Sequence, residues 1–193
     1  VASNRRAISP FTLLMTGVSV NSICLAGILF LHSIATFTQS VAITRWLMGG
    51  IESVSGTAVL WLGAVVAAAL LVAFRHARSW NALALGEEWA ILRGVPAGRV
   101  MVTGYILGSV ITGLITSLTG PIGFVELIVP HALRICFGAD HRLLIPSAFL
   151  MGGVFLAICD TVARTALAPA EIPVGVITAM LGGPFFIWLL RSR

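Results

Sequence analysis

Long apolar runs are the feature that most limits how this chain can fold. A helix needs about 20 mostly apolar residues to cross a bilayer. Five runs close to that length are separated by charged segments, at Pro10–Ala35, Thr57–Phe74, Val100–Thr119, Leu143–Cys159 and Ile172–Leu190. Hydrophobic residues make up 58% of the chain and charged residues only 10%, so no segment has the composition of a soluble domain. The sequence therefore predicts an all-α, polytopic membrane protein.

A sixth stretch, Gly120–Arg142, differs in composition from these five runs and reads GPIGFVELIVPHALRICFGADHR. Glycines and a proline break its first residues, one acid lies at Glu126, and we expect the apolar run to stop at Pro130-His131. Non-helical backbone at membrane depth survives only against protein or beside a water-filled cavity. We therefore expect a packed interior with a function here, which completes a sixth crossing only if neighbouring residues extend it.

Missing motifs exclude several function classes. The chain contains no lysine, so the Walker A pattern GxxxxGK[ST] is absent and the chain cannot itself be an ATPase. An intramembrane hydrolase would need a paired nucleophile and base, but neither GxSxG nor HExxH occurs. Cys24, Cys136 and Cys159 show no CxxC spacing, and we expect free, buried thiols.

Three motifs in the second half carry a family resemblance. The segments GFVELIVPHALR, GADHRLLIPSAFLMGG and CDTVARTALAPAEIPVGVITAMLGGPFFIWLL resemble the carboxy-terminal half of FecCD-type permeases, which import iron-siderophores, haem and cobalamin through ABC transporters. The resemblance extends from about Ser9 to the last residue. It implies a single, partial permease domain over residues 1–193, with six membrane helices that correspond to the last six of a ten-helix type II importer permease.

The resemblance also implies partners and a location. The partners would be cytoplasmic ABC ATPase subunits, a periplasmic or lipoprotein substrate-binding protein, a second permease subunit in a homo- or heterodimer, and membrane lipid, in the bacterial cytoplasmic membrane. No cofactor and no nucleic acid are expected. The cargo would be a ferric siderophore, with cobalamin or haem as alternatives. A secondary transporter, which needs no ATPase, would also use broken helices and buried charge. The chain begins Val1-Ala2-Ser3 with no signal peptide, so we expect its amino-terminal half to be missing.

Arginine positions predict the membrane topology. With a cytoplasmic amino terminus, ten of the twelve arginines fall inside, and Arg45 and Arg164 fall outside. The inside set is Arg5, Arg6, Arg75, Arg78, Arg93, Arg99, Arg134, Arg142, Arg191 and Arg193. This distribution follows the positive-inside rule. We expect both ends of the chain on the cytoplasmic side.

The segment Ser79–Arg99, SWNALALGEEWAILRGVPAGR, is too charged to span the membrane but has an apolar face and three glycines. It predicts a short amphipathic helical hairpin at the cytoplasmic face. A helix resting on lipid headgroups is the alternative, although Glu87 and Glu88 would be repelled by anionic lipid. The resemblance implies the loop that couples the permease to the ATPase, and the matching positions are Leu83, Ala84, Leu85, Gly86, Ala90 and Gly94.

Other segments have two interpretations each. Small and polar residues, Asn21 among them, line one face of the first run, either for helix packing or beside a substrate path. Glu126 either lies near water or contacts the path or a neighbouring subunit, since a carboxylate at the bilayer centre is costly. The polar interval Thr36–Gly56 is expected to be a loop at the membrane surface, because Trp46 suits an interface.

Two charged groups are candidate sites. The first is a cytoplasmic cluster in which Asp140 is expected to cap the following helix and to pair with Arg134; its members are His131, Arg134, Asp140, His141 and Arg142. No metal-ligand spacing accompanies its histidines. The second is Asp160 with Arg164, spaced four apart for an ion pair at the outer end of a helix. The resemblance implies that Arg164 docks the external binding protein.

Overall fold

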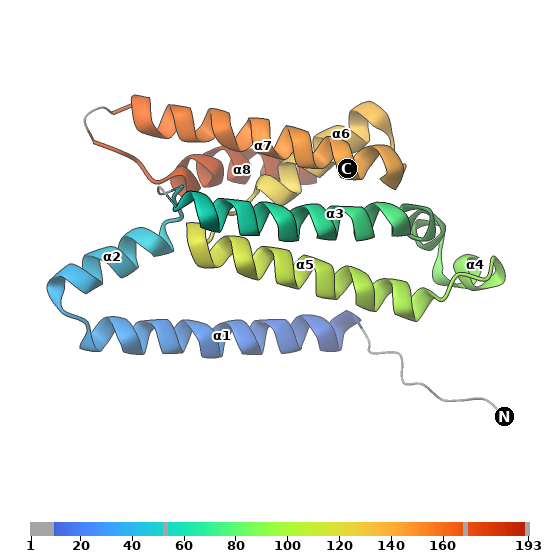
Figure 1. Cartoon of the computed structure of the whole chain (residues 1–193), viewed down its shortest axis with the longest axis horizontal. Coiled ribbons are helices and arrows are strands. Elements are labelled where there is room, and N and C mark those ends of the chain that lie inside the picture. The colour runs from blue at the N-terminus through green and yellow to red at the C-terminus, as the bar shows by residue number, and fades with distance from the viewer. Residues whose placement is uncertain (1–9, 52–53, 168–169, 192–193) are drawn as a thin grey trace. The chain divides into compact units, whose positions relative to one another are not determined.

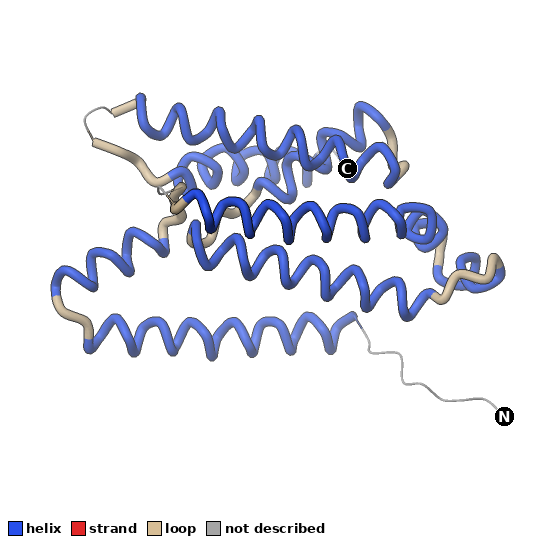
Figure 2. Tube along the Cα trace, in the orientation of Figure 1, coloured by secondary structure: helices blue, strands red, loops and turns tan. Residues whose placement is uncertain are grey.

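The computed structural model describes residues 10–51, 54–167 and 170–191, and the described chain is helical with no strand (Figure 2). This confirms the all-α fold class. The helices that it contains are α1 (Pro10–Ile34), α2 (Phe37–Leu47), α3 (Gly56–Ala84), α4 (Glu87–Leu92), α5 (Ala97–Thr119), α6 (Val125–Phe137), α7 (His141–Thr165) and α8 (Val174–Arg191).

The chain divides into two compact units, Val1–Thr44 and Arg45–Arg193, which are described separately. In the first unit, α1 begins at Pro10, whose fixed φ suits the first position of a helix. Three hydroxyl groups of α1 donate to carbonyl oxygens four residues earlier: Thr16 to Thr12, Ser19 to Met15 and Ser22 to Val18. These polar side chains are therefore satisfied within their own helix.

The helix α2 corrects the expectation of a surface loop at Thr36–Gly56. The Gln39 side-chain oxygen accepts hydrogen bonds from both the backbone N–H and the hydroxyl of Thr36, each at 3.0 Å. This is half of a capping box, in which a glutamine at the third helical position satisfies the N–H of the capping threonine. The T-x-x-Q spacing of Thr36 and Gln39 was the sequence signal for this helix, and the interpretation as a loop overlooked it.

The second unit is built around α3 and α7. Helix α3 packs against α5 and α7, and α7 packs in turn against α6 and α8 (Figure 1). Successive long helices run in opposite directions, so the turns α3–α4–α5 and α6–α7 lie at one end of the unit, and the α5–α6 and α7–α8 connections lie at the other (Figure 1). We call the first the α4 end. We call the second the Gly49 end, because Gly49 contacts the start of α8 there.

Two small apolar clusters form the core of this unit. Val129, Leu133 and Leu144 join α6 to α7, while Cys159, Ala163 and Val174 join α7 to α8.

The three cysteines are free, and Cys159 is buried, as expected. Cys24 and Cys136 are exposed, so burial was wrong for these two, because their helices turn these positions away from the protein interior.

The expected stop at Pro130-His131 is also wrong. Helix α6 continues through Pro130 to Phe137. Proline removes one backbone hydrogen bond from a helix interior, but the flanking Val129 and Leu133 are buried against α7 and hold the helix on both sides of it. Buried apolar contacts therefore outweigh the local penalty.

Among the described residues, four helices are long and apolar enough to cross a membrane: Phe11–Ile34, Gly56–Ala84, Ala97–Thr119 and His141–Thr165. The apolar part of α8, Val174–Leu189, is shorter. Helix α6 has 13 residues, which is about 20 Å of helix against a hydrocarbon core of about 30 Å. The described chain is thus a polytopic membrane fold, and the expected number of six crossings stays a prediction.

Candidate functional site

The turn after α3 is shaped by a glycine. Helix α3 ends at Ala84, with Leu85 as its cap, and the N–H of Gly86 donates to the carbonyl of Leu83 at 3.0 Å. Gly86 then adopts φ 123° and ψ 148°, a conformation essentially confined to glycine, and α4 begins at Glu87. The expected helical hairpin over Ser79–Arg99 is therefore corrected: α3 continues to Ala84, and only the six residues of α4 form a separate helix.

A Schellman motif ends α4. The Val95 N–H donates to the Ala90 carbonyl at 3.0 Å, and the Gly94 N–H donates to the Ile91 carbonyl at 2.9 Å. Gly94 has φ 76°, the left-handed conformation that this motif requires. Ala90 is fully buried, so α4 is anchored by its inner face and by a glycine at each end.

The outer surface of α4 is apolar and unpartnered within the described chain. Leu85, Trp89, Ile91 and Leu92 are exposed, Leu92 to 79%. Glu87 and Glu88 lie in the first turn of α4, where the helix dipole favours negative charge. An apex that combines four exposed apolar side chains with two acids suits contact with another protein better than contact with water.

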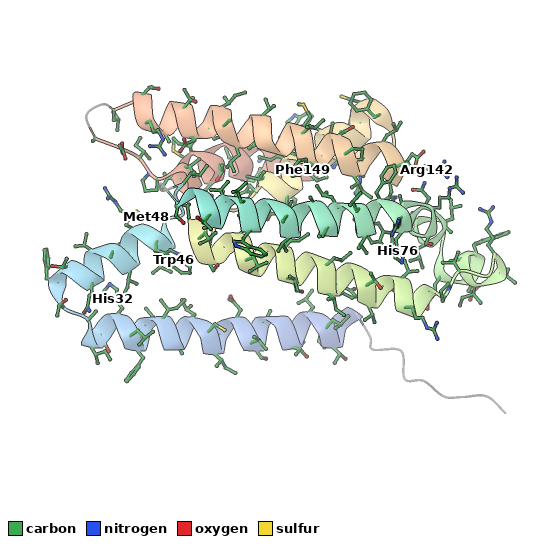
Figure 3. The ribbon with its side chains drawn as sticks, viewed as in Figure 1. His32, Trp46, Met48, His76, Arg142 and Phe149 are labelled. Carbon is green, nitrogen blue, oxygen red and sulfur yellow. The ribbon has the colours of Figure 1, made fainter. Side chains whose placement is uncertain are left out.

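Next to this apex, α3 is tied to the start of α7. The Asn81 side-chain nitrogen donates to Asp140 Oδ1 at 2.7 Å, and Asn81 Oδ1 accepts from the His141 backbone N–H at 2.8 Å. His141 Nδ1 lies 2.7 Å from the same Asn81 oxygen. We call Asn81, Asp140 and His141 the Asn81 clasp. Figure 3 shows His76 and Arg142 at this end of the unit.

The expected cytoplasmic cluster is only partly assembled. Asp140 caps α7 as expected, since its Oδ1 accepts from the Arg142 N–H at 2.9 Å. The expected pair of Asp140 with Arg134 is not among the ion pairs of the described residues; Asp140 Oδ1 instead accepts from Asn81 and from the Arg142 N–H. His131 instead contacts the ring of Phe185 on α8, with 6.1 Å between ring centroids. Sequence reasoning missed Asn81, whose partners lie 59 and 60 residues away.

At the Gly49 end, Arg164 makes two contacts. Its Nε donates to Asp160 Oδ2 at 2.8 Å, which confirms the expected i, i+4 ion pair. Its Nη2 atom donates to the Ile51 carbonyl at 2.7 Å and thereby ties α7 to the segment that follows α2. The Arg164 side chain stays 46% exposed, so part of the guanidinium remains available to a partner.

Three glycines at this end let backbones approach closely. A Cβ on Gly120 would overlap the Trp46 carbonyl oxygen, and a Cβ on Gly175 would overlap that of Met48. The Gly175 N–H donates to the Gly49 carbonyl at 3.1 Å, while the Gly50 N–H donates to that of Thr119 at 2.8 Å. Trp46 and Met48 are labelled here in Figure 3. The segment after α2 is therefore locked to the ends of α5 and α8.

The two candidate pathway residues lie in different units. Asn21 is an exposed residue of α1. Glu126 is exposed in the first turn of α6, where the helix dipole favours its charge. Within the described residues, no group of three or more His, Cys, Asp or Glu side chains is placed to hold a metal ion.

Comparison with known proteins decides the family. The sequence matches the FecCD transport family over residues 1–192, almost its whole length. The chain belongs to the FecCD transport family. This membership confirms the family resemblance.

Several FecCD relatives and a solved structure are similar to the chain. It is 37% identical over 182 residues to the hemin transport system permease of Yersinia pestis, covering 94% of this chain and 54% of that protein. It is 39% identical over 191 residues to the vitamin B12 import system permease of Escherichia coli, covering 96% and 57%. A solved putative metal-chelate type ABC transporter in an inward-facing conformation gives a TM-score of 0.85 at 28% identity, covering 96% of this chain and 60% of that one. The chain thus spans little more than half the length of these relatives.

Proposed function

We propose that this chain is the carboxy-terminal part of the permease subunit of an ABC importer. Family membership supports the class, and the apex of α4 is the observation that carries the mechanism. The apex lies in the turn between α3 and α5 (Figure 1), and its apolar side chains are exposed. The helix bounds place Arg75, Arg78, Arg93, Arg99 and Arg142 at the same end of the unit. Positive residues favour the cytoplasmic side, where an ATPase would be present.

In this proposal, the α4 apex is the surface that binds the ATPase. Leu85 and neighbouring apolar side chains would enter a groove of the partner, while Gly86 and Gly94 set the angle of α4, and buried Ala90 anchors it; Leu83 and Ala84 complete the coupling segment. ATP binding by the partner would shift α4, and the helices that carry it would follow. A secondary transporter would need no such apex, and transport insensitive to vanadate would favour that alternative.

The opposite end would face the binding protein. Arg164 is held by Asp160 and the Ile51 carbonyl, yet it is partly exposed, so its guanidinium is already oriented toward an acidic partner. A second permease subunit would complete the path, with Asn21 and Glu126 as candidate lining residues. The subunit would cross the bacterial cytoplasmic membrane six times within this segment, with both ends inside.

The proposed cargo is a ferric siderophore. Similar proteins are named for hemin and vitamin B12, and the similar solved structure for a metal chelate. Haem and cobalamin are therefore the alternatives within the same proposal. Uptake of each labelled chelate by the full-length transporter in proteoliposomes, with the other two as competitors, identifies the cargo.

The test of the α4 proposal is Leu92→Glu in the full-length permease. Leu92 is 79% exposed, so the change leaves the interior intact but adds charge to the apolar apex. We expect ATPase binding to the permease to weaken by about tenfold or more, as for an interface hot spot, and transport to fall with it. Co-purification and ATP hydrolysis in proteoliposomes measure both quantities.

The matched control is Leu167→Glu, which makes the same change at an exposed leucine of the Gly49 end. It should leave ATPase binding unchanged. Normal ATPase binding by the Leu92→Glu permease would contradict the proposal that α4 binds the ATPase. A wild-type permease that neither binds an ATPase nor transports would sink the importer proposal as a whole.

A further inference from the structure

The Asn81 clasp connects the proposed ATPase-binding apex to a helix that reaches the far end of the unit. Asn81 lies in the last turn of α3, directly before the coupling segment, and α7 begins at His141. Both ends of the Asn81 carboxamide are used, as donor to Asp140 and as acceptor from His141. A single side chain therefore joins α3 to the first turn of α7.

Neighbouring contacts restrict the geometry of this connection. The Trp80 ring lies 6.3 Å from the His141 ring and 6.4 Å from that of His76, measured between centroids. The same indole lies against Gly104 of α5, where an added Cβ would be 3.6 Å from Trp80 Cζ2. The clasp thus lies beside an aromatic contact that also involves α5, and the end of α3 has little room to slide against α7.

Helix α7 extends the connection across the unit. Its 25 residues make about 37 Å of helix, with the clasp at its first residue and Arg164 next to its last. Arg164 in turn contacts the Ile51 carbonyl. Packed helices and hydrogen bonds of this kind form the contiguous physical path by which two distant sites are coupled.

We propose that Asn81 is a positioning residue that transmits movement of α4 to α7. This inference rests on the proposed function, in which α4 receives movement from an ATPase. With the clasp intact, a displacement of α4 moves the start of α7 with it, and α7 carries the movement to the Arg164 end. Without the clasp, the last turn of α3 absorbs the displacement, so ATP is hydrolysed without transport.

The experiment compares Asn81→Leu with wild type in the full-length permease, assembled with its ATPase and binding protein in proteoliposomes. Leucine keeps the branched shape of asparagine but removes its hydrogen bonds to Asp140 and His141. We expect the transport rate per ATP hydrolysed to fall about tenfold, a normal size for a coupling free energy, while the affinity for the ATPase stays unchanged. Stimulation of ATP hydrolysis by the binding protein should fall in parallel.

The matched control is Thr103→Val, which removes a hydrogen bond at the same end of the unit, but one made within α5 to the Arg99 carbonyl. It should transport as wild type does. Unchanged transport per ATP in Asn81→Leu overturns the proposal, and so does a loss of ATPase binding that accounts for all of the lost transport. A wild-type complex without ATP-dependent transport instead refutes the proposed function on which the inference rests.

A second measurement keeps Asn81, so the clasp itself is unaltered. Spin labels at Glu88→Cys on α4 and Ala139→Cys beside the clasp report the distance between the two segments, with the native cysteines replaced by serine. If the clasp holds, this distance stays constant between the nucleotide-free and ATP-bound complexes, while the distance from Glu88→Cys to a labelled subunit of the ATPase changes. Separation of the two permease labels on ATP binding overturns the proposal.

Discussion

Gly86 shows how much one backbone conformation decides in this chain. Its φ of 123° and ψ of 148° turn the chain from α3 into α4. A Cβ at this position would lie 3.7 Å from Trp89 Cδ1, which is an ordinary contact. The requirement for glycine therefore comes from the backbone and not from lack of space.

We expect Gly86→Ala to destabilise the permease by about 1–3 kcal/mol, the cost of a residue held in a conformation that it rarely adopts. The readout is thermal unfolding in detergent, together with ATPase binding, which should weaken as α4 changes its angle. Gly98→Ala is the control, because Gly98 lies in the first turn of α5 with open space around it and has no positive φ. Alanine should be neutral or slightly stabilising there. Equal melting temperatures for the two variants would contradict this account of the turn.

At the scale of whole elements, α6 and α8 meet through a glycine and an aromatic ring. Phe124 precedes α6 with φ 69°, the only non-glycine residue with positive φ in the described chain. Its ring lies on Gly182 of α8, where a Cβ would overlap the Phe124 side chain near its root. Because the overlap involves atoms close to the backbone, a rotation of the ring cannot relieve it.

Gly182→Ala should therefore cost about 1–3 kcal/mol of stability, as overpacking of a closed contact does. The adjacent Gly183→Ala has no atom within 4 Å of its Cβ and should be neutral or slightly stabilising. Melting temperatures of the purified permease give the comparison. Adding Phe124→Ala should make the Gly182→Ala change less costly than it is in the wild-type background, because the colliding ring is gone. Purely additive effects would show that the two residues are not in contact.

At the scale of the whole molecule, charge and packing distinguish the two ends of the second unit. The α4 end holds the exposed apex, the Asn81 clasp and Arg142, which Figure 3 labels. The helix bounds place Arg75, Arg78, Arg93 and Arg99 at this end too, and Arg45 and Arg164 at the Gly49 end. An arginine excess on one side of a membrane protein marks the cytoplasmic side. The topology that the arginine positions predict, with the α4 end inside, stays a prediction.

This orientation is testable in intact cells that express the full-length permease without its native cysteines. A thiol at Glu88→Cys, on exposed α4, should react with a membrane-impermeant maleimide only after the cells are opened. A thiol at Ala170→Cys, in the exposed connection after α7, should react in intact cells. The reverse pattern would invert the topology, and with it the assignment of both docking surfaces.

Local sequence signals were sufficient for much of this fold. Helix α5 ends at Thr119, as expected, because glycine follows it. The Asp140 cap and the ion pair of Asp160 with Arg164 also follow from residues two to four positions apart. Such contacts depend on the geometry of a single helix and its end, which sequence spacing fully specifies. The T-x-x-Q cap of α2 belongs to the same class, although it was overlooked.

The sequence by itself thus determined the helical class, the membrane character and the local caps, since hydropathy and short spacings encode them directly. Only the tertiary structure decided that α6 continues through Pro130 and that Asn81 joins α3 to α7. It also decided that Trp46 packs against Gly120 and Phe124 against Gly182. Each of these depends on partners from distant parts of the chain, such as the 59 residues between Asn81 and Asp140. The physical reason is that close packing and long-range hydrogen bonds arise only when helices are assembled, and no local pattern records which helices will meet.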